Sequence, residues 1–436
     1  NMSQPAPMTL ARALFSALAW AAQPLLRRKL RRRALAEPGY AEAMPERFGH
    51  YQPPTLGQDG RGQWVWIHAV SLGEARAAGI LVKALREQLP DMRLLLTQST
   101  ATGRAEGQKL LREGDVQVWL PWDTLGATNR FIEQFRPAVG VLMETEIWPN
   151  LIAGCANAGI PLALANARLN AKSEAGALKL KPISRAAYGA LAAVWAQTED
   201  DARRLRNVGA HVGAVLGNLK FDVEPDAVQM AHAAQWSAAL PKPVLLFASS
   251  REGEEALFMD ALKSLGDRAA AVQWLIVPRH PQRFDEVAQL LTNKGFVVSR
   301  RTQWQELPPV PDGAVWLGDS LGEMALYYGL SSAAFMGGSF APLGGQNLIE
   351  ALACGCPVLL GPHTFNFSQA SEEAVKAGAA LRVADMNSAL SEALALVADP
   401  ERLNAARQSG KQMMQSNRGA AAATAQAVIE LMNAPE

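Results

Sequence analysis

Short apolar runs alternate with longer helical patterns along most of the chain. The first series of runs begins at Trp64 and comprises residues 64–70, 93–97, 116–120, 138–143, 161–166, 193–197 and 212–217. A second series begins at Val244 and comprises residues 244–249, 274–278, 295–299, 314–318, 333–337, 357–361 and 379–383. The runs are continuous rather than alternating, which is typical of parallel strands buried on both faces. The pattern therefore predicts parallel sheets whose strands are joined by helices through right-handed crossovers.

A break in this rhythm separates the two series and predicts two Rossmann-like, doubly wound α/β domains that face each other across a cleft. The boundaries we expect are 1–36 for an N-terminal apolar and basic segment, 37–225 for the first domain, 226–243 for a linker, 244–415 for the second domain and 416–436 for a C-terminal helix that packs back on the first domain. Ligands of such sheets bind outside the carboxyl ends of the strands. The residues that follow each strand are therefore the candidates for chemistry.

Composition agrees with two folded domains and adds an uneven charge. The chain has 436 residues, of which 49% are hydrophobic and 19% charged, so a large core is possible and disorder is not expected. The net charge is +1, yet residues 1–36 carry seven basic residues and no acid. The three cysteines form no C-x-x-C pair, which argues against a disulfide framework or a structural zinc site and indicates a reducing compartment.

The N-terminal segment combines an apolar stretch, Leu10–Leu26, with the basic run "RRKLRRR" behind it. Arg12, Gln23 and Pro24 interrupt the stretch, which makes it a marginal membrane span. The charge follows the apolar part, the wrong order for a signal peptide. We favour an amphipathic anchor on an anionic membrane surface, with the basic flank on the cytoplasmic side. A basic helix packed on the domain is the alternative. Nucleic-acid binding is not expected, because no aromatic residues are interleaved with the basic run.

The first strand is followed by "SLGE", in which Ser71 and Glu74 have the spacing of a capping box. A carboxylate at a strand's carboxyl end is also placed to accept a proton from an attacking hydroxyl. Both roles remain open for Glu74. His68, on the strand itself, is expected to be a core histidine.

A pair of acids, Glu144 and Glu146, follows the fourth run and flanks Thr145. The spacing of two predicts that they share one face of a continued strand, where they can share protons, hold a cation or bind sugar hydroxyls. The alternative is an acid pair that complements the dipole of the helix starting at Pro149. Lys220, after the seventh run, is suited to a phosphate, with a surface lysine as the alternative.

In the second half, the strand ends carry arginines and glycines. Arg279 and Arg283 flank a helix start and predict a phosphate clamp. The loop after residues 333–337 turns through glycine pairs to a helix start near Asn347, with Glu350 one turn further. Such a loop lets the backbone approach an anionic ligand, and Glu350 is placed to bond a ribose diol. A capping box formed by Asn347 and Glu350 is the alternative.

Taken together and in this order, several motifs resemble the 3-deoxy-D-manno-octulosonic acid (Kdo) transferases of lipopolysaccharide and lipid A–core synthesis. The motifs are "WIHAVSLGE", "ETEIWPNL", "NARL", "GNLKFD", "PRHPQRF", "GDSLGEM" and "GGSFAPLGGQNLIEA…GPHTFNF". The resemblance covers most of the chain, as far as about Phe367. It implies a GT-B glycosyltransferase on the cytoplasmic face of the bacterial inner membrane, with CMP-Kdo as donor and a tetraacylated lipid A precursor (lipid IVA) as acceptor.

The resemblance also assigns roles to residues, in a reaction that inverts the anomeric carbon and uses no metal or cofactor. Glu74 matches the catalytic base, and Glu144 and Lys220 match positions that stabilise the transition state. The residues that match the CMP site are Pro278, Arg279, Leu321, Gly322, Glu323, Asn347, Leu348, Ile349 and Glu350. The chain departs from the family at Arg251, where histidine is common, and in the details of the loop before Glu350.

Two other functions compete with this interpretation. One is a different nucleotide-sugar enzyme of the same architecture, a UDP-sugar transferase or an epimerase. The basic N-terminal segment argues against the epimerase, which needs no membrane anchor. The other is a membrane-bound nucleotide-binding scaffold without activity, which would need no base at the position of Glu74.

Overall fold

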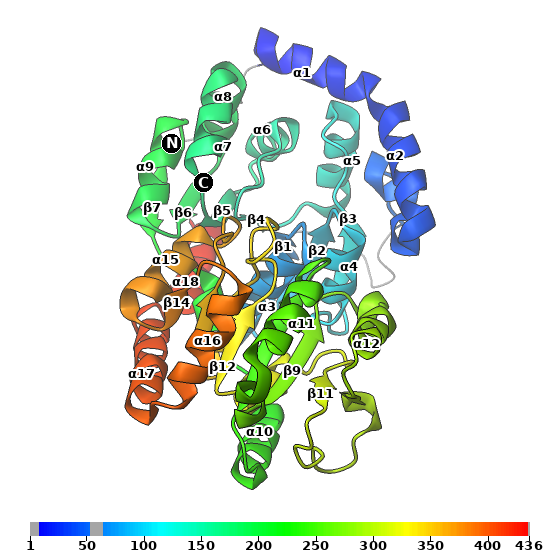
Figure 1. Cartoon of the computed structure of the whole chain (residues 1–436). Coiled ribbons are helices and arrows are strands. Elements are labelled where there is room, and N and C mark those ends of the chain that lie inside the picture. The colour runs from blue at the N-terminus through cyan, green and yellow to red at the C-terminus, as the bar shows by residue number, and fades with distance from the viewer. Residues whose placement is uncertain (1–7, 53–63, 435–436) are drawn as a thin grey trace. The chain divides into compact units, whose positions relative to one another are not determined.

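The computed structural model describes residues 8–52 and 64–434 and divides into two compact units (Figure 1). The N-terminal unit comprises Asn1–Asp222 and Arg418–Glu436, and the C-terminal unit comprises Val223–Asn417. The chain thus returns to the first unit through its last helix. Residues 226–243, expected as a linker, contain helix α10 (Ala227–Ala239), whose Trp236 is buried within the C-terminal unit.

The N-terminal unit is built on a seven-stranded parallel sheet with the order β3-β2-β1-β4-β5-β6-β7. Its strands are β1 (Trp64–His68), β2 (Arg93–Gln98), β3 (Val116–Trp119), β4 (Val139–Met143), β5 (Leu162–Ala167), β6 (Ala193–Ala196) and β7 (Val212–Val215). Its helices are α1 (Leu10–Ala21), α2 (Gln23–Ala36), α3 (Leu72–Gln88), α4 (Ala101–Gln108), α5 (Leu125–Phe135), α6 (Pro149–Asn157), α7 (Ala171–Lys179), α8 (Lys181–Ala190), α9 (Glu199–Asn207) and α18 (Ala420–Met432).

The C-terminal unit repeats this plan with the strand order β10-β11-β9-β8-β12-β13-β14. Its strands are β8 (Val244–Ser250), β9 (Gln273–Pro278), β10 (Val298–Arg300), β11 (Val315–Leu317), β12 (Ala333–Met336), β13 (Val358–Leu360) and β14 (Ala380–Arg382). Besides α10, its helices are α11 (Glu254–Leu265), α12 (Phe284–Asn293), α13 (Met324–Leu330), α14 (Ile349–Ala353), α15 (Ser368–Ala377), α16 (Met386–Val397) and α17 (Pro400–Ser416).

Each apolar run predicted from the sequence overlaps one of these strands, and the prediction of parallel α/β sheets is confirmed. The reason is visible in β1 and β4, which are buried along their whole length between helices on both faces. Apolar side chains are required at every position of such a strand, so the period of two disappears from the sequence.

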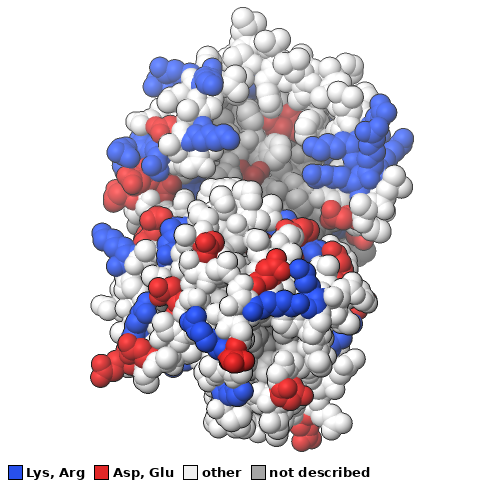
Figure 2. All heavy atoms as spheres, viewed as in Figure 1, with Lys and Arg blue, Asp and Glu red and all other residues white. Residues whose placement is uncertain are grey.

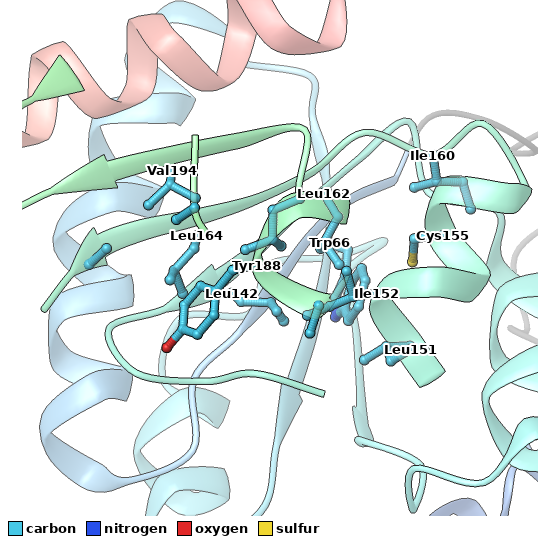
Figure 3. Close-up of a cluster of buried hydrophobic side chains, with 14 of the residues drawn as sticks. Trp66, Leu142, Leu151, Ile152, Cys155, Ile160, Leu162, Leu164, Tyr188 and Val194 are labelled. Carbon is cyan, nitrogen blue, oxygen red and sulfur yellow. The ribbon is translucent and has the colours of Figure 1, made fainter. Parts of the chain in front are cut away.

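The core of the N-terminal unit lies on both faces of its sheet (Figure 3). On the face drawn in Figure 3, Trp66, Leu142 and Leu164 come from three strands and pack against α6 and α8. On the opposite face, alternate strand residues pack against α3 and the returning helix α18, whose Ala425 and Val428 are fully buried. The last helix therefore completes the core of the first unit.

The order of strands reverses direction beside β1 in the N-terminal sheet and beside β8 in the C-terminal sheet. At such a switch point the connections leave neighbouring strands toward opposite faces, which opens a crevice at the carboxyl ends. β1 and β4 pair directly, as do β8 and β12. The loops after these four strands are therefore the places where the fold favours a ligand.

The N-terminal segment forms two helices, α1 and α2, separated at Ala22. The buried face of α1 carries Arg12, Ser16 and Ala19, and Ser16 Oγ lies 3.1 Å from Asn150 Oδ1 of α6. Its large apolar residues point away from the unit instead: Leu10 is 88% exposed, Leu14 63% and Leu18 64%. Within residues 8–52 and 64–434, no helix combines the length and apolarity that crossing a membrane requires.

Candidate active site

The acids singled out in the first half of the sequence lie together at the switch point of the N-terminal sheet. Glu74 stands in the first turn of α3, directly after β1, and Glu144 follows the last residue of β4. His68 of β1 lies opposite Leu142 of β4, so the two loops leave adjacent strands at the same edge. Electrostatic coupling links Glu74 with both Glu144 and Glu146.

Glu74 forms the capping box that the sequence suggested, and it does so with one oxygen. Its Oε2 accepts hydrogen bonds from the backbone N–H groups of Val70 and Ser71, both at 2.9 Å, and from Ser71 Oγ at 3.2 Å. Its own N–H donates to Ser71 Oγ at 3.4 Å. Nothing in the described part of the chain donates to Oε1. The capping box therefore fixes the orientation of the carboxylate and leaves its second oxygen available, so the two roles considered for Glu74 are compatible.

Glu144 is held between two cations at the end of β4. Its side chain is only 2% exposed; Oε1 lies 2.9 Å from Lys220 Nζ, and Oε2 accepts a hydrogen bond from Arg168 Nε at 3.0 Å. The prediction that Glu144 and Glu146 share a face of a continued strand is wrong, because β4 ends at Met143 and Glu144 has φ +59°. This left-handed conformation is unfavourable for glutamate and turns the chain so that its carboxylate enters the buried ion pair.

The three neighbouring carboxylates have different proton affinities. Burial raises the pKa of Glu74, and the negative charge of Glu144 raises it further. Burial and the charge of Glu74 raise the pKa of Glu146 to about 7. Burial alone would raise the pKa of Glu144 as well, but Lys220 and Arg168 outweigh it and hold that pKa below the ordinary value. The site thus combines one glutamate whose ionised form is stabilised, Glu144, with two whose protonated form is favoured, Glu74 and Glu146.

Side chains from two further strand ends position Lys220. Asn166 near the end of β5 has φ +51°, and its Oδ1 accepts a hydrogen bond from Leu219 N at 2.9 Å. Asn218 Oδ1 accepts from Lys220 N at 3.0 Å, and a short helical turn, η4 (Leu219–Asp222), follows. Lys220 is therefore fixed by its backbone as well as by Glu144. Because Lys220 forms an ion pair with the buried Glu144, it is not a free surface lysine.

The helix that starts at Pro149 is capped by a residue that the sequence analysis missed. Asp123 accepts hydrogen bonds from Asn150 N at 3.0 Å and Leu151 N at 2.8 Å, at the N-terminus of α6. The first turn of α6 itself contains no acid. Asp123 therefore caps the backbone N–H groups at the start of α6, and Glu144 and Glu146 both precede that helix. Burial raises the pKa of Asp123 to about 6.

In the C-terminal unit, Arg279 and Glu350 both lie close enough to the buried Tyr328 for their charges to act on its hydroxyl. Pro278 ends β9, and the N–H of Arg279 donates to Ser250 O of β8 at 3.0 Å. Both Glu350 and Arg279 act electrostatically on the Tyr328 hydroxyl, whose pKa is raised first by burial and then by the glutamate. A cation and an acid are thus brought together from β9 and from the loop after β12.

The loop after β12 reaches its helix later than expected. Helix α14 begins at Ile349, and Asn347 Oδ1 accepts from Ile349 N at 3.1 Å without forming a capping box with Glu350. Leu348 and Ile349 are buried. Their side chains therefore serve packing, and Asn347 and Glu350, both half-buried, are the members of this stretch with polar groups near the surface.

The remaining candidates of this unit surround the start of α13. Glu323 precedes the helix and forms a 3.0 Å ion pair with Arg301, a residue that the sequence analysis missed. Leu321 is exposed, and Gly322 has φ +75° and accepts from Gln229 Nε2 through its carbonyl at 2.7 Å. The carboxylate of Glu323 is therefore bound by Arg301.

Two further arginines of the C-terminal unit have partners of their own. Arg283 lies 2.7 Å from the buried Glu255 and 3.1 Å from Glu286, so the prediction of a clamp formed by Arg279 and Arg283 is wrong. Arg251 lies 3.1 Å from Glu252.

A buried acid that no sequence motif singled out connects the two loops of this switch point. Glu254, in the first turn of α11, is fully buried. It accepts backbone hydrogen bonds from Gly338 at 2.7 Å, Phe340 at 3.1 Å and Ala341 at 3.2 Å, and from Arg251 at 2.9 Å. The loop after β12 is therefore shaped by a carboxylate from the loop after β8.

Two Rossmann-like units with polar side chains at their switch points are the plan of nucleotide-sugar enzymes of the GT-B type. A UDP-GlcNAc 2-epimerase from Neisseria meningitidis, solved with UDP-GlcNAc, has this fold and aligns with 85% of this chain and 99% of its own, with a TM-score of 0.54 at 16% identity. By its fold, then, the protein is of the GT-B class.

Sequence relatives identify the family within this class. The family model described as 3-Deoxy-D-manno-octulosonic-acid transferase (kdotransferase) matches residues 42–223. The 3-deoxy-D-manno-octulosonic acid transferase of Bordetella pertussis is 47% identical over 84% of this chain and 86% of its own length. The Haemophilus influenzae enzyme of the same name is 32% identical over 94% of this chain and 96% of its own. The chain belongs to the Kdo transferase family and is a glycosyltransferase, which decides against the scaffold and the epimerase.

Proposed function

We propose that this protein transfers Kdo from CMP-Kdo to a tetraacylated lipid A precursor, with inversion at the anomeric carbon and with Glu74 as the general base. Membership of the Kdo transferase family supports Kdo as the sugar that is transferred. The observation that carries the mechanism is the carboxylate of Glu74, which is buried, oriented through Oε2 and free of protein donors at Oε1 within the described residues.

In the proposed step, Oε1 of Glu74 removes the proton from a hydroxyl of the acceptor sugar. The hydroxyl oxygen forms a bond to the anomeric carbon of Kdo, and the bond from that carbon to the CMP phosphate breaks. CMP leaves with the electron pair. The raised pKa of Glu74 strengthens the carboxylate as a base.

Glu144 and Lys220 act on this step through charge. The ion pair keeps Glu144 ionised beside Glu74, and that negative charge raises the proton affinity of the base. Lys220, at the same edge of the sheet, supplies a cation that stabilises the negative charge developing in the transition state. The arrangement therefore needs no metal, and chelation with EDTA is expected to leave the rate of transfer unchanged.

We assign the donor nucleotide to the switch point of the C-terminal unit. Arg279 supplies a cation for a phosphate, and Glu350 is placed to accept hydrogen bonds from the ribose. Pro278, Gly322 and Asn347 shape the surrounding backbone. Leu348 and Ile349 support this site from the core, whereas Leu321 and Glu323 border it at the start of α13.

The N-terminal helices support a place at an anionic membrane surface. The outward stripe of α1 is apolar, with Leu10, Leu14 and Leu18 exposed, and α2 carries the basic run (Figure 2). An amphipathic helix of this kind lies in the interface, with its basic flank on anionic headgroups. We infer the cytoplasmic side from the positive charge. Replacing Leu14 and Leu18 by glutamine should reduce sedimentation with anionic vesicles while thermal stability is retained.

The proposed base is tested with Glu74→Gln, because glutamine preserves the length of the side chain and can still serve in a capping box. Transfer from CMP-Kdo, read from the mass of the lipid product, should fall by ~10²–10⁴. Thermal stabilisation by CMP should be retained. Glu87→Gln, at the exposed last turn of the same helix, is the matched control and should behave as the wild type. Turnover of Glu74→Gln within a few-fold of the control would remove Glu74 from this role.

A further inference from the structure

A second polar pocket lies in the N-terminal unit, apart from the carboxylates. It has a volume of about 190 Å³ and is enclosed between the inner face of α2 and the loops that follow β2 and β3. Lys29 and Arg33 of α2, Arg47 and Tyr40 line one part of it, and Ser99 and Trp148 line another. Its lining, as far as the chain is described, contains no aspartate or glutamate.

The guanidinium of Arg47 is the group in this pocket that the fold holds in a fixed position. Arg47 is 8% exposed and stacks on Trp119, with its Cζ 3.7 Å from the ring centroid. One nitrogen, Nη1, donates to Ser99 O at 3.0 Å. Nε and Nη2 are buried and have no hydrogen-bond partner in the described residues. A buried guanidinium with two free N–H sides is unfavourable unless a ligand accepts from it.

The surrounding charge favours a doubly charged anion. Burial lowers the pKa of Arg47 to about 10, and the neighbouring Arg104 contributes in the same direction, so an anion placed here would be strongly attracted. The charge of the adjacent acid, Glu46, offsets part of this effect on Arg47, but Glu46 already accepts from Trp119 N at 2.9 Å and does not line the pocket. Lys29 and Arg33 add two more cations at the rim. Arginine binds phosphate and carboxylate in bidentate fashion, and three cations without a lining acid suit a phosphate dianion better than a single carboxylate.

We propose that this pocket binds a phosphate monoester carried by the glycolipid acceptor, and that Arg47, Arg33 and Lys29 hold it. The inference rests on the proposed function for the acceptor and adds to it the chemical group that the enzyme recognises.

The position of the pocket fits this role. Ser99 and the loop after β3 lie at the carboxyl edge of the sheet, the edge where Glu74 and Glu146 stand. Trp148, only two residues after Glu146, belongs to the pocket lining. α2 forms the opposite wall, so a lipid whose sugar reaches Glu74 can place a phosphate between the active site and the basic helix.

A pair of double variants separates this pocket from the general attraction of a basic helix. Lys29→Gln with Arg33→Gln removes two charges from the pocket, and Arg28→Gln with Arg32→Gln removes two from the other groove along α2. Both pairs lower the charge of α2 equally and alter side chains that are exposed. Arg47 itself is left in place, because its stacking on Trp119 is part of the core packing.

The first measurement needs no turnover. Stabilisation of the full chain by inorganic phosphate, relative to chloride at equal ionic strength, should be present in the wild type and in the Arg28/Arg32 pair. It should be lost in the Lys29/Arg33 pair. Equal loss in both pairs would overturn the proposal, since the effect would then be that of net charge. This arm reports on the pocket even if Kdo transfer itself is not observed.

The second measurement identifies the source of the phosphate. The KM for the lipid acceptor is compared with the KM for the same lipid after enzymatic removal of its phosphates. The Lys29/Arg33 double variant should raise the KM for the phosphorylated acceptor by about tenfold or more, which is the effect of losing a charge-assisted hydrogen bond. Its KM for the dephosphorylated acceptor should equal that of the wild type. The control pair should keep the wild-type ratio of the two KM values. An unchanged ratio in the pocket pair would overturn the assignment to the acceptor and leave a phospholipid headgroup or free phosphate as the occupant.

Discussion

The ion pair between Glu144 and Lys220 makes a quantitative prediction about stability. Replacing Lys220 by methionine preserves most of the side-chain volume and removes the cation 2.9 Å from a carboxylate that is only 2% exposed. Removing one partner of a fully buried pair destabilises a protein by ~3–5 kcal/mol. Here Arg168 remains 3.0 Å from the same carboxylate, and Lys220 keeps 19% of its side-chain surface in water. We therefore expect a smaller loss, about 1.5–3 kcal/mol in the free energy of unfolding.

Equilibrium urea unfolding at pH 7.5 measures this loss, with Lys109→Met as the control. Lys109 lies 2.8 Å from Glu106 but is 71% exposed, so its replacement should change the free energy of unfolding by less than ~1 kcal/mol. In a Glu144→Gln background, Lys220→Met should lose much of its effect, because no buried charge is left unpaired. A loss no larger than that of Lys109→Met, or an equal loss in both backgrounds, would refute the reasoning.

The same pair predicts a pH dependence with a definite sign. Glu144 has a lowered pKa in the folded protein, so its stabilising contribution is present above the unfolded pKa of ~4.3 and is lost as the pH falls through the folded value. Without Lys220 the folded pKa rises, and Glu144 can take up a proton at higher pH. The difference in stability between Lys220→Met and the wild type should therefore be largest near neutral pH, shrink as the pH falls, and vanish only below the lowered pKa of Glu144 in the wild type.

Three more outcomes follow from buried groups and close contacts. Glu146 has a pKa raised to about 7, so Glu146→Gln should increase the free energy of unfolding at pH 8, by ~1–3 kcal/mol, and the gain should disappear toward pH 4, as urea unfolding at both values would show. Glu254→Gln leaves backbone donors without a carboxylate and should lower the stability of the C-terminal unit by ~2 kcal/mol or more and weaken CMP binding, both measurable by thermal shift. Gly337→Ala should destabilise strongly in the same assay, because the added Cβ would lie 1.9 Å from Ser249 O, whereas Gly213→Ala, with nothing within 4 Å, should be tolerated.

The sequence predicted the sheets well because strands that are buried on both faces require apolar side chains at consecutive positions. It also placed Glu74, Glu144 and Lys220 after strands, and the parallel arrangement brings those ends to one edge. It could not predict the roles of Arg168 and Asp123, whose partners lie 24 and 27 residues away along the chain. The left-handed turn at Glu144 also escaped prediction, because glutamate has no preference for that conformation.

By itself, then, the sequence determined the order of the elements, the two parallel sheets and the set of polar residues at the strand ends. Only the tertiary structure decided which carboxylate stays ionised, which oxygen of Glu74 is left without a donor, and that Leu348 and Ile349 are packed inside. It also decided that Arg47 keeps two N–H groups unpaired beside a pocket. The reason is that periodicity is a local property of the chain, whereas proton affinity and burial are set by neighbours that only folding brings into contact.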